Sequence, residues 1–185
     1  MDNGASSYRR FLDGDDTAIA EMVGTYKDGL ILYLNGYVHN IFAAEELAED
    51  TFFRLITKKP RFGGNSSFKS FLYAIGRNVA VDYIRHQSKV RQIPLEEAEN
   101  YVAAVENLEQ IYLREEQKLD LNRALAQLPD EYRHVLWLNF FEGFSNQEIA
   151  AVMHKNERQV RNLLYRAKQS LKSILEKERF VYEDL

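Results

Sequence analysis

Basic side chains gather in one short segment near the C-terminal end of the sequence. Residues 155–172 contain a single acidic residue, Glu157, and six basic ones, which are Lys155, Arg158, Arg161, Arg166, Lys168 and Lys172. Arg and Asn side chains can form paired hydrogen bonds with the edges of guanine and adenine, and Lys and Arg can also neutralise phosphates. A charged helix face is more often only a solvated surface. The chemistry therefore depends on the elements that present these side chains.

Two short capping patterns flank this segment and predict a pair of helices. Residues 145–148 read Ser-Asn-Gln-Glu, which is a capping box that starts a helix with Ile149, Ala150 and Met153 on its apolar face. His154 and Lys155 form the expected turn, since His adopts the left-handed conformation at modest cost. Residues 156–159 read Asn-Glu-Arg-Gln and predict the start of the second helix.

The second helix is predicted to be amphipathic. Its buried stripe is expected to be Val160, Leu164, Ala167, Leu171 and Ile174. A short capped helix, a tight turn and a longer basic helix favour a helix-turn-helix that places its second helix in the major groove. The candidate contacts to bases are near the helix start and the contacts to phosphates lie farther along; together the predicted DNA-binding residues of this helix are Glu157, Arg158, Arg161, Asn162, Tyr165, Arg166, Lys168 and Lys172.

The composition indicates an all-α chain of two small domains. The 185 residues include only three prolines and no cysteine, and the net charge is −4. Disulfides and thiolate metal sites are thereby excluded, and a reducing cytoplasm is the expected location. No apolar run is as long as a membrane span, and the first residues do not resemble a signal peptide. The acidic excess lies in residues 87–116, which hold three basic and seven acidic residues.

Apolar spacing predicts where the domains and helices lie. The predicted domains are residues 8–86 and 117–178, joined by a linker over 87–116. Within the first domain, helical structure is expected from Thr17, with Asp15 or Asp16 as its cap, and helices are expected over Ala44–Ile56 and Phe68–His86. The expected inward residues are Leu47, Phe52 and Leu55 on the former and Phe68, Leu72, Ile75 and Val79 on the latter. Lys58–Ser67 is expected to be a loop because it contains Pro and Gly.

The Phe68–His86 helix interleaves aromatic and basic side chains. Asn78, Asp82 and Arg85 share one face, and Asp82 is expected to pair with Arg85. Such a surface suits a single DNA strand, because bases stack on aromatic rings while the backbone follows positive charge. Aromatic residues at helical spacing are nevertheless more often part of a core.

These motifs resemble the extracytoplasmic-function (ECF) group of the sigma-70 family of bacterial RNA polymerase sigma factors. Residues 124–129, 132–136, 141–150 and 159–167 are similar to region 4, which reads the promoter −35 element, although His154 and Lys155 replace the usual Gly and aliphatic residue of the turn. Residues 67–86 resemble the part of region 2 that melts and captures the −10 element. Residues 44–55 resemble the part that docks on core RNA polymerase.

The resemblance implies roles for named residues. The predicted −10 contacts are Arg61, Asn65, Phe71, Tyr73, Arg77, Asn78, Asp82 and Arg85, with the loop from Arg61 to Ser66 helping to form a pocket for a flipped base. The predicted polymerase-docking residues are Glu46, Glu49, Asp50, Phe53 and Arg54. The implied partners are the largest-subunit clamp and the flap of core polymerase, promoter DNA and an anti-sigma factor.

No catalytic constellation is expected. The four histidines are scattered, and Gly63-Gly64 is not followed by the rest of a phosphate loop. The sequence thus predicts neither an enzyme nor a metal, cofactor or small-molecule site. Two alternatives remain open: a helix-turn-helix regulator with a partner-binding or sensing N-terminal domain, and a helical adaptor or enzyme without a DNA role. Residues 44–86 argue against the first, and the basic segment with its two capping patterns argues against the second.

Overall fold

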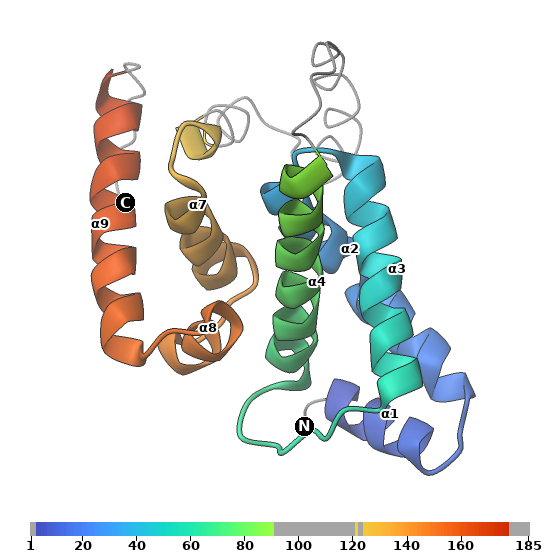
Figure 1. The fold of residues 1–185 in the computed structure, drawn as a ribbon. Helices are drawn as coiled ribbons and strands as arrows, with labels where there is room; N and C mark the ends of the chain where they lie inside the picture. The colour runs from blue at the N-terminus through green and yellow to red at the C-terminus, as the bar shows by residue number, and fades with distance from the viewer. Residues whose placement is uncertain (1–2, 91–120, 122–123, 178–185) are drawn as a thin grey trace.

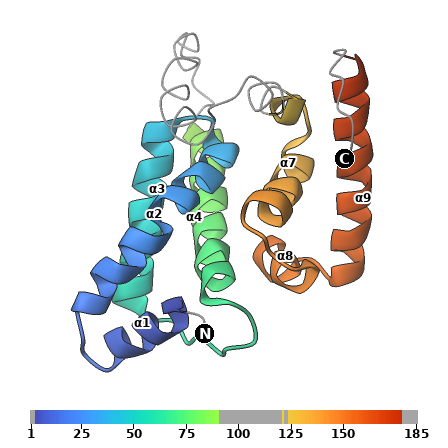
Figure 2. The ribbon, with the colours of Figure 1, turned by 180° about the vertical axis from the view of Figure 1, so that it is seen from behind.

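The protein is all-α, as the sequence predicts, and its helices form two units that lie side by side (Figures 1 and 2). The computed structural model describes residues 3–90, 121 and 124–177, and this part of the chain contains no strand. Its elements are α1 (Asn3–Leu12), α2 (Thr17–Val38), α3 (Ile41–Lys58), α4 (Phe68–Val90), α7 (Asp130–Leu136), the π-helical turn η1 (Trp137–Phe141), α8 (Asn146–Met153) and α9 (Glu157–Lys177).

The first unit comprises α1 to α4. Helices α2, α3 and α4 pack on one another, and α1 lies across the ends of α2 and α4. The expected inward residues of α3, namely Leu47, Phe52 and Leu55, are buried, as are Phe68, Leu72 and Val79 of α4. Ile75 is only partly buried and packs at the edge of the same core. Apolar spacing therefore located this core correctly.

Helix α1 was not predicted, because the helical block was expected to begin at Thr17. Its amphipathic face is short, but Tyr8 and Phe11 insert into the core and are almost completely buried. The Tyr8 hydroxyl also donates a hydrogen bond of 2.7 Å to the carbonyl oxygen of Pro60, in the loop between α3 and α4. Tertiary packing of two aromatic side chains thus holds a helix that is too brief to be recognised from its pattern.

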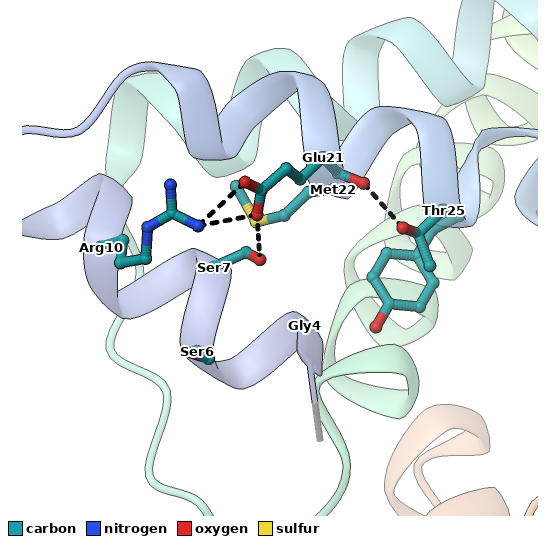
Figure 3. Close-up of a pocket in the computed structure, with 8 residues that line it drawn as sticks. Gly4, Ser6, Ser7, Arg10, Glu21, Met22 and Thr25 are labelled. Atoms are coloured by element: carbon teal, nitrogen blue, oxygen red, sulfur yellow. Dashed lines mark hydrogen bonds and ion pairs between the residues drawn. The ribbon is translucent and has the colours of Figure 1, made fainter. Parts of the chain in front are cut away.

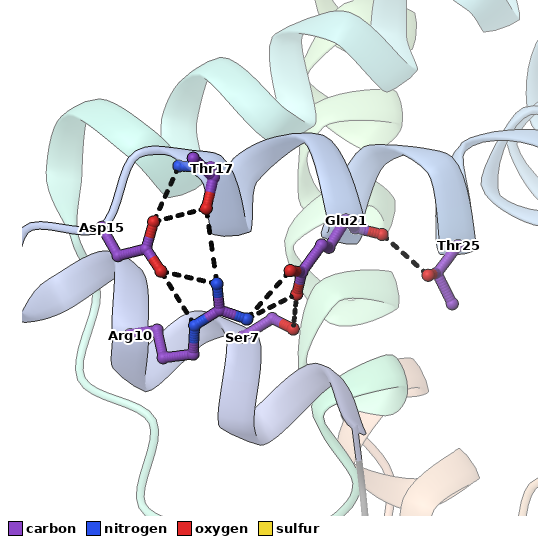
Figure 4. A network of polar contacts seen from close by, with 6 residues as sticks. All are labelled: Ser7, Arg10, Asp15, Thr17, Glu21 and Thr25. Carbon is purple, nitrogen blue, oxygen red and sulfur yellow. Dashed lines mark hydrogen bonds and ion pairs between the residues drawn. The ribbon is translucent and has the colours of Figure 1, made fainter.

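A guanidinium joins α1 to α2 (Figure 4). Arg10 donates to Asp15 through Nε, at 2.9 Å, and contacts both oxygens of Glu21 at 2.9 Å. Asp15 also accepts a hydrogen bond from the backbone N–H of Thr17 at 3.0 Å, while Asp16 makes no side-chain cap bond. Of the two predicted caps, Asp15 is therefore the one that is used.

The bounds of α3 and α4 differ modestly from those predicted. Helix α3 begins at Ile41, because the side chain of Asn40 accepts a hydrogen bond of 3.1 Å from the Ala43 N–H. Helix α4 continues to Val90, so the first residues of the expected linker are helical. The remainder of that linker, the expected start of the second domain at 117 and the tail Phe180–Leu185 lie outside the described residues.

The second unit comprises α7, η1, α8 and α9, and it contacts the first through α7 and α8. Helix α8 packs against α4, and α7 reaches α2. In both views α9 lies on the side of its unit that is farther from α4 (Figures 1 and 2). Within the described ranges no helix is both long and apolar enough to cross a membrane.

Candidate nucleic-acid interface

Helices α8 and α9 form the predicted helix-turn-helix. The Ser145 side chain accepts a hydrogen bond from the Glu148 N–H at 3.3 Å, and the Glu148 carboxylate accepts one from the Ser145 N–H at 3.0 Å. His154 adopts the left-handed conformation, with φ 53° and ψ 46°, and the Lys155 N–H donates to the Ala150 carbonyl oxygen. The predicted capping box and the conformation of the turn are thus confirmed.

The second cap is reciprocal as well. The backbone N–H of Asn156 donates to the Gln159 side chain, and the N–H of Gln159 donates to the Asn156 side chain, both at 2.9 Å. These bonds satisfy orphan donors at the start of α9 and fix the direction in which the helix leaves the turn. The first turn of α9, which carries the candidate base contacts, is therefore held in place from both sides.

Helix α9 divides cleanly into a buried and an exposed face. Val160, Leu164, Ala167 and Leu171 are buried as predicted, and Leu163 and Leu175 extend the buried face; Ile174 is only partly buried. All predicted DNA-binding residues of this helix are exposed: Glu157, Arg158, Arg161, Asn162, Tyr165, Arg166, Lys168 and Lys172. Lys168 lies over the ring of Phe140 at 4.9 Å, and Lys172 is 3.8 Å from Glu176. The rest of this face is open to a ligand.

The predicted −10 residues do not form one continuous exposed set. Arg61 and Asn65, in the loop, and Asn78, Asp82 and Arg85, on α4, are exposed. Phe71 and Arg77 are half-buried, and the ring of Phe71 lies among the aromatic side chains at the base of the first unit. Two details of the prediction for this helix are wrong.

The first correction concerns Tyr73, whose side chain is completely buried. Its ring centroid lies 5.1 Å from that of Tyr33 on α2 and 5.4 Å from that of Phe144, which precedes α8. A ring enclosed in this way cannot stack on a base in this structure. Tyr73 is therefore a core residue and not a DNA contact, which is the more common role of aromatic residues at helical spacing.

The second correction concerns the partner of Asp82. Its carboxylate lies 3.4 Å from the guanidinium of Arg54 on α3, and the predicted pair with Arg85 does not form. The exposed Arg85 guanidinium is thus not held by Asp82. A side chain can find an ion-pair partner on an adjacent helix instead of one turn away on its own helix. Spacing in the sequence reveals only the partner on the same helix.

The predicted docking residues line the outer surface of α3. Glu46, Glu49, Asp50 and Phe53 are exposed, and Phe53 retains 65% of its accessible surface; Arg54 is partly exposed. Phe42, 62% exposed, lies one helical turn before Glu46 and was missed. Phe42 could have been predicted from its spacing, because residues four and eleven positions apart, here Glu46 and Phe53, lie on the same face of a helix. We call Phe42, Glu46, Glu49, Asp50, Phe53 and Arg54 the α3 outer surface.

A cavity of about 290 Å³ between α1 and α2 was not predicted (Figure 3). It is lined by Gly4, Ser6, Ser7, Arg10, Glu21, Met22, Thr25 and Tyr26. Its charged groups are already partnered, because Arg10 contacts Glu21 and the Ser7 hydroxyl donates to the same carboxylate at 2.8 Å. Hydrogen bonds from Arg10 and Ser7 lower the pKa of Glu21. The cavity therefore has the character of a packing feature, and in the described part of the chain no group of three acidic, His or Cys side chains could hold a metal ion.

The fold and the basic face of α9 define a helical protein of the helix-turn-helix class, joined to a second helical unit with an acidic and aromatic surface. Family models for sigma-70 region 2 and sigma-70 region 4 match residues 22–90 and 118–171. The chain is 27% identical to RNA polymerase sigma-H factor of Pseudomonas aeruginosa over 171 residues, which covers 88% of this chain and 89% of that protein. It is 32% identical to ECF RNA polymerase sigma factor SigE of Mycolicibacterium smegmatis, covering 89% and 65%.

Solved structures show the same fold. The sigma factor RpoE of Bartonella quintana, in complex with the anti-sigma factor NepR, is 21% identical, with a TM-score of 0.67 over 86% of this chain and 98% of that one. CnrH, in complex with the cytosolic domain of CnrY, is 20% identical, with a TM-score of 0.65 over 94% and 95%. This chain belongs to the sigma-70 family and is an RNA polymerase sigma factor of the ECF type.

Proposed function

We propose that α9 reads the duplex of the promoter −35 element. The observation that carries this assignment is the exposed basic face of α9, presented by a doubly capped helix-turn-helix. Arg158, Arg161 and Asn162 lie in its first two turns, where side chains of a recognition helix meet base edges. Arg166, Lys168 and Lys172 lie farther along and suit phosphates, which position the protein without specifying sequence.

The first unit is proposed to hold the opened −10 strand. Arg61 and Asn65 in the loop, with Asn78 and Arg85 on α4, supply exposed polar and cationic groups along one side of the unit. Extruding a base costs a few kcal/mol of lost stacking, which contacts of this kind must offset. The fully buried Tyr73 is left out of this set.

The α3 outer surface is proposed to dock on the clamp of core RNA polymerase. It combines two exposed phenyl rings with three carboxylates, whereas soluble chains rarely expose large apolar side chains together without a partner. The polymerase would hold the two predicted domains, residues 8–86 and 117–178, at two sites joined by the linker. Binding of one domain to DNA would then raise the effective concentration of the other at its own DNA element, so two weak contacts would together bind tightly. The role is that of a non-catalytic specificity subunit in the cytoplasm.

An anti-sigma factor is proposed as a further partner. RpoE of Bartonella quintana and CnrH are described as complexes with NepR and with the cytosolic domain of CnrY. The proposal for this chain rests on its shared family and fold.

Transcription in vitro tests the whole assignment. Core RNA polymerase of the source bacterium is supplied with fragmented genomic DNA, with and without the protein. New transcript starts that require the protein, and whose upstream sequences share two elements, are the expected result. The double variant Arg158→Ala/Arg161→Ala should lose these starts, while His86→Asn, remote from α9, should retain them. Binding to duplex DNA without any new start would instead favour a helix-turn-helix regulator.

A further inference from the structure

Three of the four histidines lie where the two units meet. His39 ends α2, His134 lies on α7, and His154 forms the turn between α8 and α9. His86, the fourth, is exposed near the C-terminal end of α4. Other contacts also join the units, including the 2.7 Å ion pair between Lys69 and Glu142 and the packing of Tyr73 on Phe144.

His134 makes the most intimate of these contacts. Its imidazole is 5% exposed and stacks on the ring of Tyr37 across the seam, with ring centroids 3.6 Å apart and an angle of 18°. Gly36 lies directly beside this ring, since a Cβ at that position would be 3.4 Å from the imidazole Nε2. An open pocket of about 230 Å³ also lies at the seam beside His134, and Arg77, Lys155 and Glu131 help to line it.

The groups around His134 oppose its protonation on balance. Burial lowers its pKa to about 4, and the guanidinium groups of Arg133 and Arg77 act in the same direction. The backbone of Gly36 and the carboxylate of Asp130 act in the opposite direction but are outweighed. The titratable and charged groups that face His134 are Tyr33 and Tyr37 from α2, Arg77 from α4, Asp130, Glu131 and Arg133 from α7, and Lys155 after α8.

His39 lies at the edge of the same contact. Arg133 donates to its Nε2 at 3.3 Å, and the Asp130 carboxylate is 4.0 Å from that atom. Burial and then Arg133 lower the pKa of His39, while Asp130 opposes them. An imidazole that accepts a hydrogen bond from a guanidinium must be neutral at the accepting nitrogen, so protonation would remove this contact.

Closure engages one residue of the proposed −10 surface, Asn78, whose side chain nevertheless stays exposed, and leaves the proposed −35 surface open. The Asn78 side chain contacts His154 Nε2 at 3.0 Å, and α8 lies against α4. Lys69 on α4 forms a 2.7 Å ion pair with Glu142, and the Ser67 N–H donates to Glu148 at 3.3 Å. The exposed face of α9 makes none of these contacts.

We propose that the two units close on each other in the free chain at neutral pH, and that protonation of His134 and His39 opens the seam and releases Asn78 from its contact with His154. In the open form these histidines regain ordinary pKa values near 6.5, whereas in the closed form they are lower. Closure is therefore fully favoured above about pH 6.5 and is lost progressively as the pH falls toward the closed-state values. For His134 alone, the ratio of open to closed chain should rise about 30-fold between pH 8 and pH 5.

Small-angle X-ray scattering of the full chain tests this. The radius of gyration should be small at pH 8 and larger at pH 5, with the helical circular dichroism signal unchanged. In the double variant His134→Phe/His39→Asn, which keeps an aromatic ring against Tyr37 and a residue suited to the left-handed cap, the chain should remain compact at pH 5. His86→Asn, the matched control outside the seam, should expand like the native chain. An unchanged radius in the native chain, expansion of the double variant, or loss of helix with expansion would overturn the proposal.

A second pair of variants tests closure without altering any histidine. Lys69→Glu should expand the chain at pH 8 by placing two carboxylates together, and the charge swap Lys69→Glu/Glu142→Lys should restore compactness. If Lys69→Glu leaves the radius unchanged, the seam does not hold the units together and the proposal fails.

The consequence for the −10 strand rests on the proposed function, and it has a separate readout. The probe is the fluorescent non-template strand of a promoter recovered by the transcription experiment, with binding measured at pH 8 by anisotropy. The Lys69→Glu chain should bind it more tightly than the native chain, and adding Asn78→Ala should reduce that gain. If the scattering results hold but no variant binds the strand, closure stands and the −10 assignment of α4 fails.

Discussion

Arg161 and Lys172 lie on the same exposed face of α9 but should contribute to DNA binding in different ways. Arg161 is in the second turn of the helix, where a side chain can reach base edges in the major groove. Lys172 is near the C-terminal end, has a carboxylate 3.8 Å away and suits only a phosphate. Position along the helix, rather than residue charge, therefore decides whether a contact carries sequence information.

Single substitutions separate these roles. Arg161→Ala should weaken binding of the −35 duplex and relax the preference at one base pair, since a paired contact of Arg to guanine is worth about 1–3 kcal/mol. Lys172→Ala should weaken binding to all duplexes alike and lower the slope of log affinity against log salt by about one. Anisotropy titrations with matched and single-mismatch duplexes at several salt concentrations measure both effects. Equal loss on every duplex for Arg161→Ala would contradict the base-contact role.

Residue-level predictions from the sequence succeeded where local rules decide the outcome. Capping by Ser145 and Asn156 and the left-handed turn at His154 depend only on neighbours along the chain, and all three are found. Tyr73 and Asp82 depend on what other helices bring near them. Phe144 from the second unit helps to cover Tyr73, and Arg54 on α3 takes the carboxylate of Asp82. Neither the burial of Tyr73 nor the pairing of Asp82 could be predicted from the spacing of residues within α4.

At the scale of elements, α1 is the part of the fold that the sequence concealed. It is held by Tyr8 and Phe11 in the core and by Arg10 between two carboxylates. Exposed ion pairs of this kind contribute little, so the buried aromatic side chains account for most of the docking of α1. Because the Tyr8 hydroxyl reaches Pro60, α1 also braces the loop that carries Arg61 and Asn65.

Replacement of Tyr8 tests this bracing. Tyr8→Phe removes one hydrogen bond and should lower the free energy of unfolding by about 1 kcal/mol, whereas Tyr8→Ala also empties a core site and should cost about 3–5 kcal/mol. Urea denaturation followed by circular dichroism gives both values. Arg10→Ala is the control on the same helix and should change stability far less than Tyr8→Ala, because exposed ion pairs contribute little. If Arg10→Ala costs as much as Tyr8→Ala, the ion pairs rather than the aromatic packing hold α1.

Helix α3 begins where a single side chain caps it. Asn40 satisfies the Ala43 N–H, and its replacement by Ala should cost about 1 kcal/mol of stability, while Asn40→Ser, which retains an accepting oxygen, should cost only a few tenths. The same urea titrations measure the difference. Equal losses in the two variants would mean that the cap bond does not stabilise the start of α3.

For the whole molecule, the class of fold and the division into two helical units could be predicted from the sequence, but the contact between the units could not. Hydrophobic periodicity specifies the core of each unit, since its members lie within one set of helices. The seam joins residues as distant in sequence as Tyr37 and His134, or Asn78 and His154. The structure therefore adds one fact about the proposed −10 surface that the sequence does not contain: its residue Asn78 is hydrogen-bonded to His154 where the two units meet.

The α3 outer surface lies away from this seam, so docking on polymerase should not depend on whether the units are open. Asp50→Lys reverses one exposed charge beside Phe53 and should lower the affinity for core polymerase about tenfold or more, as expected when like charges meet in an interface. Asp13→Lys, an equal charge change at an exposed position before α2, should leave the affinity unchanged. Binding of labelled chain to core polymerase, measured by anisotropy, distinguishes them. Duplex binding by the free Asp50→Lys chain should match that of the native chain, because α9 is untouched. A normal affinity of Asp50→Lys for polymerase would instead mean that this surface is solvated, and that the exposed rings of Phe42 and Phe53 serve another partner.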